Sequence, residues 1–233
     1  LIDPMKKCDN IDKHYLIEYI KQHTTGNPMH IKELIYYLIE TENVFIHEDG
    51  SLKLIGRNIN LDLETLEINE IVSKRLLFYR KNYSAILDCY IILASLCENL
   101  ATIYNYIKQI LSKIYLNYPM LEKKIGIVSD TKAEKIFLHE YYKEILKSQQ
   151  IQDEKYLESI YQHYYKICDD SVNERLDLIY LKMMYQDVDY NGIANELLTL
   201  LQENVTDSQA LNCYQILEHI PAKFRKNKTL AEI

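Results

Sequence analysis

Apolar residues recur every three or four positions along most of this chain, and this helical spacing constrains the fold more than any other feature. The stretch after Asn27 is the clearest case, because one apolar stripe runs through Ile31, Leu34, Ile35, Leu38 and Ile39. Breaks are rare, with only 5 Gly and 4 Pro among 233 residues. We therefore predict a mainly α fold, with helices over about 10–23, from 28, over 69–81, 84–97 and 100–117, and from near Glu154, Ser171, Asp189 and Asp207.

Residues typical of helix ends support these boundaries. Asn27 is a good N-cap, and Pro28 then falls at the first helical position, where its missing N–H costs nothing. Ser171 and Glu174 have the spacing of a capping box. Pro119 is expected to stop the helix over 100–117.

Two short stretches change from helical spacing to alternation. Val44 to Ile46 and Leu52 to Leu54 alternate around Asp49-Gly50, a strong hairpin signal. Residues 125–128 and 135–138 flank the polar turn 129–132 and indicate a second hairpin. Three helices followed by a two-stranded wing is the element order of a winged-helix domain.

The C-terminal part has a periodicity of its own. Its predicted helices begin about every 18 residues, so a helix pair spans about 35 residues, close to the tetratricopeptide period. The aromatic and Gly marks of that repeat are absent. We therefore predict tetratricopeptide-like (TPR-like) antiparallel helical hairpins here, and no particular repeat family.

Composition narrows the functional classes. Hydrophobic content of 48% and charged content of 26% are typical of soluble proteins, and the apolar run Tyr90–Leu96 is too short to span a bilayer. No signal peptide is recognisable, so we expect a cytoplasmic protein without a membrane partner. A net charge of −7 opposes nonspecific binding to nucleic acid. The five Cys are scattered and read as reduced core thiols: Cys8, Cys89, Cys97, Cys168 and Cys213.

The segment Gly26-Asn27-Pro28 is the first candidate for chemistry. A glycine before a helix start lets backbone approach a ligand closely, and the helix N-terminus offers N–H groups and partial positive charge. The ring of Pro28 presents a flat apolar surface to a nucleobase. Taken alone, the same residues also describe an ordinary helix start.

Residues 26–34 (GNPMHIKEL), followed by the hairpin over 44–54, resemble the end of the lid in STAND-type signal-transduction NTPases, which are related to AAA ATPases. In that family the proline packs near the adenine, and a winged-helix domain and superhelical repeats come next. The residues Phe137-Leu138-His139-Glu140 are similar to the family's hydrophobic-His-acid motif, although Asp is the common acid there. The resemblance implies that His139 contacts the β-phosphate of ADP, and an imidazole N–H suits that role.

The resemblance also implies a domain order: NTPase lid and first hairpin over 1–56, winged helix over 57–145, and helical repeats over 146–233. Gly26, Asn27, Pro28 and His139 would form the nucleotide-binding residues. No G-x-x-x-x-G-K-(S/T) loop occurs in the chain, so ATP or ADP would be held by an upstream NTPase domain. We expect a non-catalytic module that senses the nucleotide state and binds a protein partner through its C-terminal repeats.

Two other functions remain open. A DNA-binding winged-helix regulator would use residues 100–117 as its recognition helix, but that helix offers only Lys108 and Lys113. A purely helical protein–protein adaptor differs from the first interpretation only in lacking an upstream phosphate-binding loop. No metal site is expected, because the pairs His14/His23 and His139/His163 lack the spacing of a shared metal-binding face.

Overall fold

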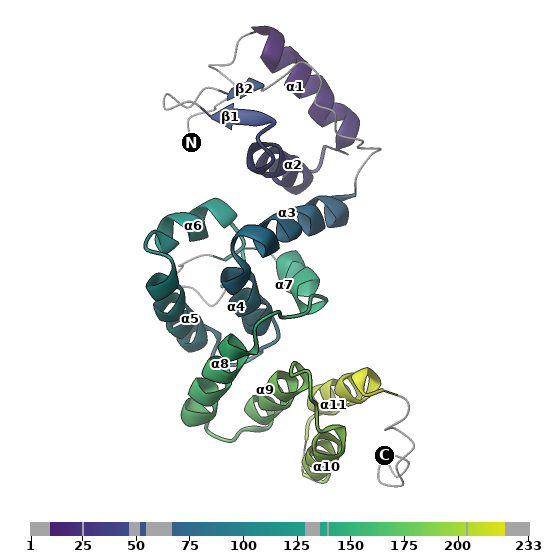
Figure 1. The fold of residues 1–233 in the computed structure, drawn as a ribbon. Helices are drawn as coiled ribbons and strands as arrows, with labels where there is room; N and C mark the ends of the chain where they lie inside the picture. The colour runs from purple at the N-terminus through teal and green to yellow at the C-terminus, as the bar shows by residue number, and fades with distance from the viewer. Residues whose placement is uncertain are drawn as a thin grey trace. The chain divides into compact units, whose positions relative to one another are not determined.

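The computed structural model describes residues 10–24, 26–46, 52–54, 67–128, 136–138, 140–203 and 205–221. The fold is mainly helical, as predicted. The chain divides into two compact units between Tyr83 and Ser84, and each is described by itself (Figure 1). The prediction of three domains stays a prediction.

The first unit contains three helices and one hairpin: α1 (Asn10–His23), α2 (Pro28–Glu40), β1 (Val44–Ile46), β2 (Leu52–Leu54) and α3 (Ile68–Asn82). The strands pair antiparallel, with Val44 opposite Leu54 and Ile46 opposite Leu52, which confirms the first predicted hairpin. Its turn, Asp49-Gly50, lies outside the described residues. The apolar stripe of α2 supplies Leu34 and Leu38 to a core completed by Leu16, Tyr19, Ile20, Val44 and Ile71.

The second unit is built around α4 (Ser84–Ala94), whose residues 85–94 are all buried. Helices α5 (Leu100–Ile114), α7 (Glu140–Lys147) and α8 (Glu154–Ile167) pack against it. A helix with apolar residues on every side needs such neighbours on every side. This helix therefore organises the first half of the unit.

Two details differ from the prediction over 100–138. Helix α5 ends at Ile114, and Pro119 lies in the first turn of a further helix, α6 (Tyr118–Ile125), instead of stopping α5. Proline fits there because the first N–H groups of a helix have no partner within it. Ile125 belongs to α6, and the second predicted hairpin reduces, within the described residues, to the single antiparallel bridge Val128–Phe137.

The last helices of the second unit are α9 (Val172–Met183), α10 (Tyr190–Leu201) and α11 (Asp207–His219). The starts predicted near 154, 171, 189 and 207 are confirmed, as is the capping box of Ser171 and Glu174. The three helices pack around one apolar cluster: Leu176, Ile179, Ile193, Leu197, Leu200, Cys213, Ile216 and Ile220. Residues 222–233 lie outside the described part of the chain.

Candidate functional site

The predicted contact residues Gly26, Asn27 and Pro28 lie together at the start of α2, and all three are exposed. Asn27 caps the helix as predicted, because its side-chain oxygen accepts a hydrogen bond from Met29 N at 2.9 Å. Gly26 has φ +78°, and a Cβ added there would meet no atom within 4 Å. Glycine is therefore favoured at this position by its left-handed backbone conformation and not by lack of space, because no atom lies close to where a side chain would begin.

The same helix is anchored by a buried ionic cluster. Arg75 of α3 donates through Nε and Nη2 to Glu40, at 2.9 Å and 2.7 Å, and through Nη1 to Glu33. The hydroxyl of Tyr79 also donates to Glu40. All three charged side chains are at most 2% exposed, and the guanidinium lies 4.8 Å from the ring centre of Tyr36.

Burial and charge act in opposite directions on this cluster. Burial alone lowers the pKa of Arg75, but the hydrogen bonds and charge of Glu40 and the charge of Glu33 raise it above its ordinary value. The pKa of Tyr79 is raised, first by burial and then by the charge of Glu40. The guanidinium of Arg75 is thus held in its charged form between two carboxylates. Because Glu33 and Glu40 both belong to α2, this single side chain of α3 links the two helices at two points.

His139, the predicted phosphate contact, lies outside the described residues. Its neighbours are placed: Leu138 N donates to Ile127 O at 3.0 Å, and Phe137 is buried beside the bridge to Val128. Helix α7 then begins at Glu140. The role of His139 stays a prediction.

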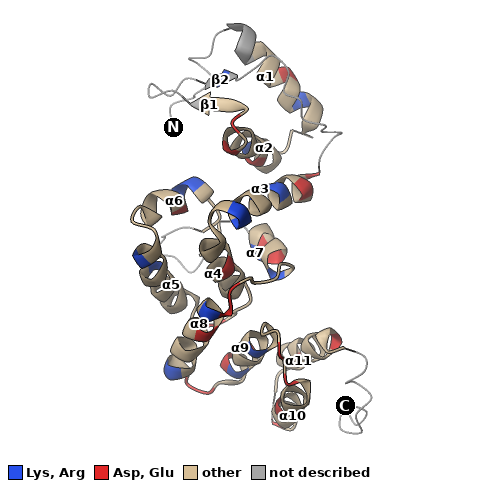
Figure 2. Ribbon diagram, in the orientation of Figure 1, with Lys and Arg blue, Asp and Glu red and all other residues tan. Residues whose placement is uncertain are grey.

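Buried acids also join separate segments of the second unit. Asp177 of α9 accepts hydrogen bonds from Cys97 N at 2.9 Å, Glu98 N at 2.8 Å and the Tyr164 hydroxyl at 2.8 Å. Burial raises the pKa of Asp177 to about 6, although these donors lower it. Asp88, the single acidic residue of α4 (Figure 2), accepts from the amides of residues 152 and 153. Each carboxylate thus accepts hydrogen bonds from the backbone N–H groups of a loop that is distant in sequence, so these buried polar groups are paired.

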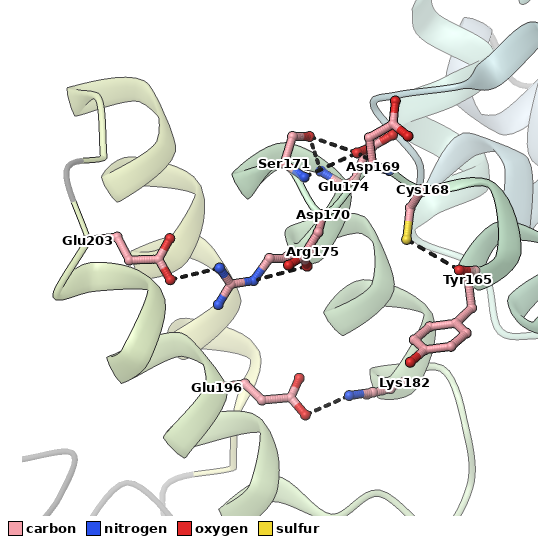
Figure 3. Close-up of polar contacts among 10 residues, drawn as sticks. All are labelled: Tyr165, Cys168, Asp169, Asp170, Ser171, Glu174, Arg175, Lys182, Glu196 and Glu203. Carbon is pink, nitrogen blue, oxygen red and sulfur yellow. Dashed lines mark hydrogen bonds and ion pairs between the residues drawn. The ribbon is translucent and has the colours of Figure 1, made fainter.

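Surface ion pairs link α9 to α10 and to the segments that precede α9 and follow α10 (Figure 3). Arg175 contacts Glu203 at 2.7 Å and Asp170 at 3.8 Å, while Lys182 contacts Glu196 at 2.6 Å. Because these groups are a quarter or more exposed, each pair contributes little to stability, about 0–1 kcal/mol. The apolar cluster beneath them therefore fixes the spacing of these helices.

A groove of about 970 Å³ opens within the second unit. It runs between the α4–α5 loop, α7 with the segment that follows it, α9 and α11. Three features recur along its walls: carboxylates, side-chain amides, and a floor of Met and Tyr. The residues that carry them are Glu144, Glu154, Asp177 and Glu218; Gln149, Gln150, Asn173, Gln186, Asn212 and Gln215; and Tyr180, Met183, Met184, Tyr185 and Tyr190.

Within the described ranges, no group of three or more His, Cys, Asp or Glu residues is arranged to hold a metal ion. In the same ranges, no helix has the length and apolar character needed to cross a membrane. The described cysteines are free thiols. Cys89 and Cys213 are buried, as predicted for core thiols, but Cys168 is half-buried and Cys97 is exposed where it lines the groove, so the prediction of a core position was wrong for these two.

Sequence reasoning missed the roles of the buried charges. Glu33 was recognised only as part of residues 26–34, and neither Arg75 nor Asp177 was singled out. A signal existed for Asp177, which stands between Leu176 and Leu178 in an apolar stretch. A charge in such a position is buried only with partners, so it predicts a specific contact.

No protein-family model matches this chain, and neither the curated proteins nor the solved structures contain a significant match.

Proposed function

We propose that this chain is the regulatory, nucleotide-state-sensing and partner-binding part of a STAND-like signal-transduction ATPase located in the cytoplasm, and that it is not itself catalytic. The nucleotide, ATP or ADP, is held by an upstream NTPase domain. Gly26, Asn27 and Pro28 contact its base side, and His139 contacts its phosphates.

The observation that carries this proposal is the difference in exposure along residues 26–34, which form the start of α2 and the two residues before it. Gly26 and Pro28, at one end, are exposed to solvent, whereas Glu33 and Leu34 are fully buried. Glu33 is also paired with Arg75 of α3. An exposed contact end and a rigid ionic anchor on one helix are the two parts that a mechanical relay needs.

The relay follows from the stiffness of this link. A nucleotide that contacts the start of α2 in one state only would favour one position of the helix. Because Arg75 binds both Glu33 and Glu40, which lie about two turns apart along α2, α3 has to follow any movement of α2. A difference of about 1–3 kcal/mol between the two nucleotide states is enough to couple distant sites.

The element order supports the rest of the proposal. Helices α3 to α5, then the short helix α6 and the bridge Val128–Phe137, are compatible with a winged-helix domain over 57–145 that carries one extra helix before its wing. Helices α8 to α11 begin 18, 18 and 17 residues apart, which suits TPR-like hairpins over 146–233. The groove in that part of the chain offers the surface for a protein partner.

The DNA-binding alternative is weaker for a physical reason. Helix α5 buries Ile103, Ile107 and Leu111. Lys108 lies 5.0 Å from the ring centre of Tyr104 and is half-buried, so the helix presents little free positive charge. A recognition helix needs several exposed side chains that reach bases and phosphates.

The test is ADP affinity in the full-length protein, measured by calorimetry. We expect His139→Ala and Pro28→Ala each to weaken ADP binding, and His163→Ala to leave it unchanged, because His163 stacks on Tyr106 elsewhere in the fold. Equal ADP affinity in all four proteins would rule out the sensor role. A full-length protein without a phosphate-binding loop would also rule it out.

A further inference from the structure

We infer that the groove of the second unit binds a peptide segment that combines Lys or Arg with aliphatic side chains. This inference rests on the partner-binding half of the proposed function and makes it specific. The groove is defined by its carboxylates, its amides and its Met and Tyr floor, as described above.

The size and floor of the groove fit a short peptide. Its volume of about 970 Å³ lies at the upper end of the range for ligand pockets, about 300–1,000 Å³. Met183 and Met184 lie half-buried on the floor beside Tyr180. Methionine side chains adapt their shape to an aliphatic partner, and tyrosine offers an apolar ring with a polar tip.

The side-chain amides indicate that the ligand is a polypeptide. Gln149 and Gln186 line the groove, and so do Asn212 and Gln215, which belong to α11. A carboxamide offers both donors and an acceptor, which is the pattern of a peptide bond. Several carboxamides along one groove can therefore pair with an extended main chain whatever its sequence.

The charges indicate that the peptide is basic. Among the described residues that line the groove, the carboxylates include Glu144, Glu154 and Glu218, and Lys147 is the one Lys or Arg side chain. The side chain of Glu144 is 66% exposed, and its contact with Lys147 is long, at 3.9 Å, so its charge is only partly compensated. Glu154 accepts Gln186 N at 2.6 Å and keeps its charge in place. Opposite charge across such a surface selects the partner and speeds association.

Nucleic acid is excluded by the same charges, because a phosphate backbone requires a basic surface. A purely apolar ligand would displace the water around exposed wall groups such as the Glu144 carboxylate without replacing its hydrogen bonds. A basic, aliphatic peptide satisfies all three kinds of wall residue at once.

The experiment compares two fluorescent peptides by anisotropy, using the full chain without nucleotide. One capped peptide alternates Lys with Leu, and the other alternates Glu with Leu. We expect saturable binding of the Lys peptide only, weakened as NaCl rises to about 0.5 M. Equal binding of the two peptides, or no binding of either, would overturn the inference.

A pair of variants locates the binding. Glu144→Lys/Glu218→Lys should weaken the Lys peptide about tenfold, because two wall charges change sign. Glu140→Lys/Asp169→Lys changes the net charge equally at exposed positions outside the groove and should have little effect. Equal losses in both proteins would contradict a groove site. If the first protein is misfolded by circular dichroism, the single Glu218→Gln change must still show a loss.

This experiment is separate from the nucleotide test. Failure of peptide binding with intact ADP sensing removes only the inferred ligand. Loss of ADP sensing with intact peptide binding removes only the sensor role.

Discussion

Replacing Arg75 by Met tests whether the buried ionic cluster holds α2 and α3 together. The change keeps the length and packing of the side chain but leaves Glu33 and Glu40 without their counter-ion, and both carboxylates are at most 2% exposed. Breaking a buried pair by removing one partner costs about 3–5 kcal/mol. The cost is large because the remaining charges are already desolvated.

The assay is amide hydrogen exchange read by mass spectrometry on peptides from α2 and α3. It reports the opening free energy of these helices separately from the second unit. We expect a deficit of about 3–5 kcal/mol in the opening free energy of these peptides at pH 7. Lys81→Met is the matched control, because Lys81 is exposed on the same helix, and should change little.

A milder variant covers the case in which Arg75→Met unfolds the first unit. Glu33→Gln keeps an acceptor for Arg75 and leaves Glu40 as the counter-ion, so we expect a loss of about 1–3 kcal/mol in the same peptides. A deficit below about 1 kcal/mol for Arg75→Met would refute the reasoning.

Three further predictions concern local stability. The folded pKa of Asp177 is about 6 and its unfolded pKa is lower, so ionisation of this group lowers the free energy of unfolding by about 3 kcal/mol as pH rises from about 4 to 6. Urea unfolding of Asp177→Asn, measured across this pH range, should lack the loss. Identical pH profiles for the two proteins would contradict the prediction. Gly26→Ala should lower the opening free energy of α2 in hydrogen exchange by about 1–2 kcal/mol through backbone strain alone, since a Cβ meets no atom there. Leu197→Ala should cost about 2–5 kcal/mol in urea unfolding, because the side chain is fully buried among α9 to α11; the exposed Leu211→Ala should cost far less.

Periodicity predicts the helices well because an apolar stripe has only one way to be buried. The stripe after Asn27 became α2, and the starts from Glu154 onward fell within a residue of their predicted places. The error at Pro119 has a definite cause. Proline is compatible with the first turn of a helix as well as with the position after one, and the sequence alone does not distinguish the two.

The candidate site was harder to predict, because its decisive contacts join residues far apart in sequence. Arg75 meets Glu33 and Glu40 across 42 and 35 positions, and no local pattern announces such a pairing. The exposed start of α2 was predictable because Asn27 and Pro28 act within one turn.

One sequence signal could have predicted some of these long-range contacts. Asp88 is the only charged residue in the apolar helix α4, and Asp177 is flanked by leucines. Burying an unpaired carboxylate costs so much that each such residue has to have donors. In both cases the donors proved to be loop amides, at residues 152–153 and 97–98. An acid between apolar residues of a helix therefore predicts that backbone N–H groups of a distant loop lie against that helix, and in this chain one such pair, Asp177 and Cys97, lines the groove to which we assign a peptide.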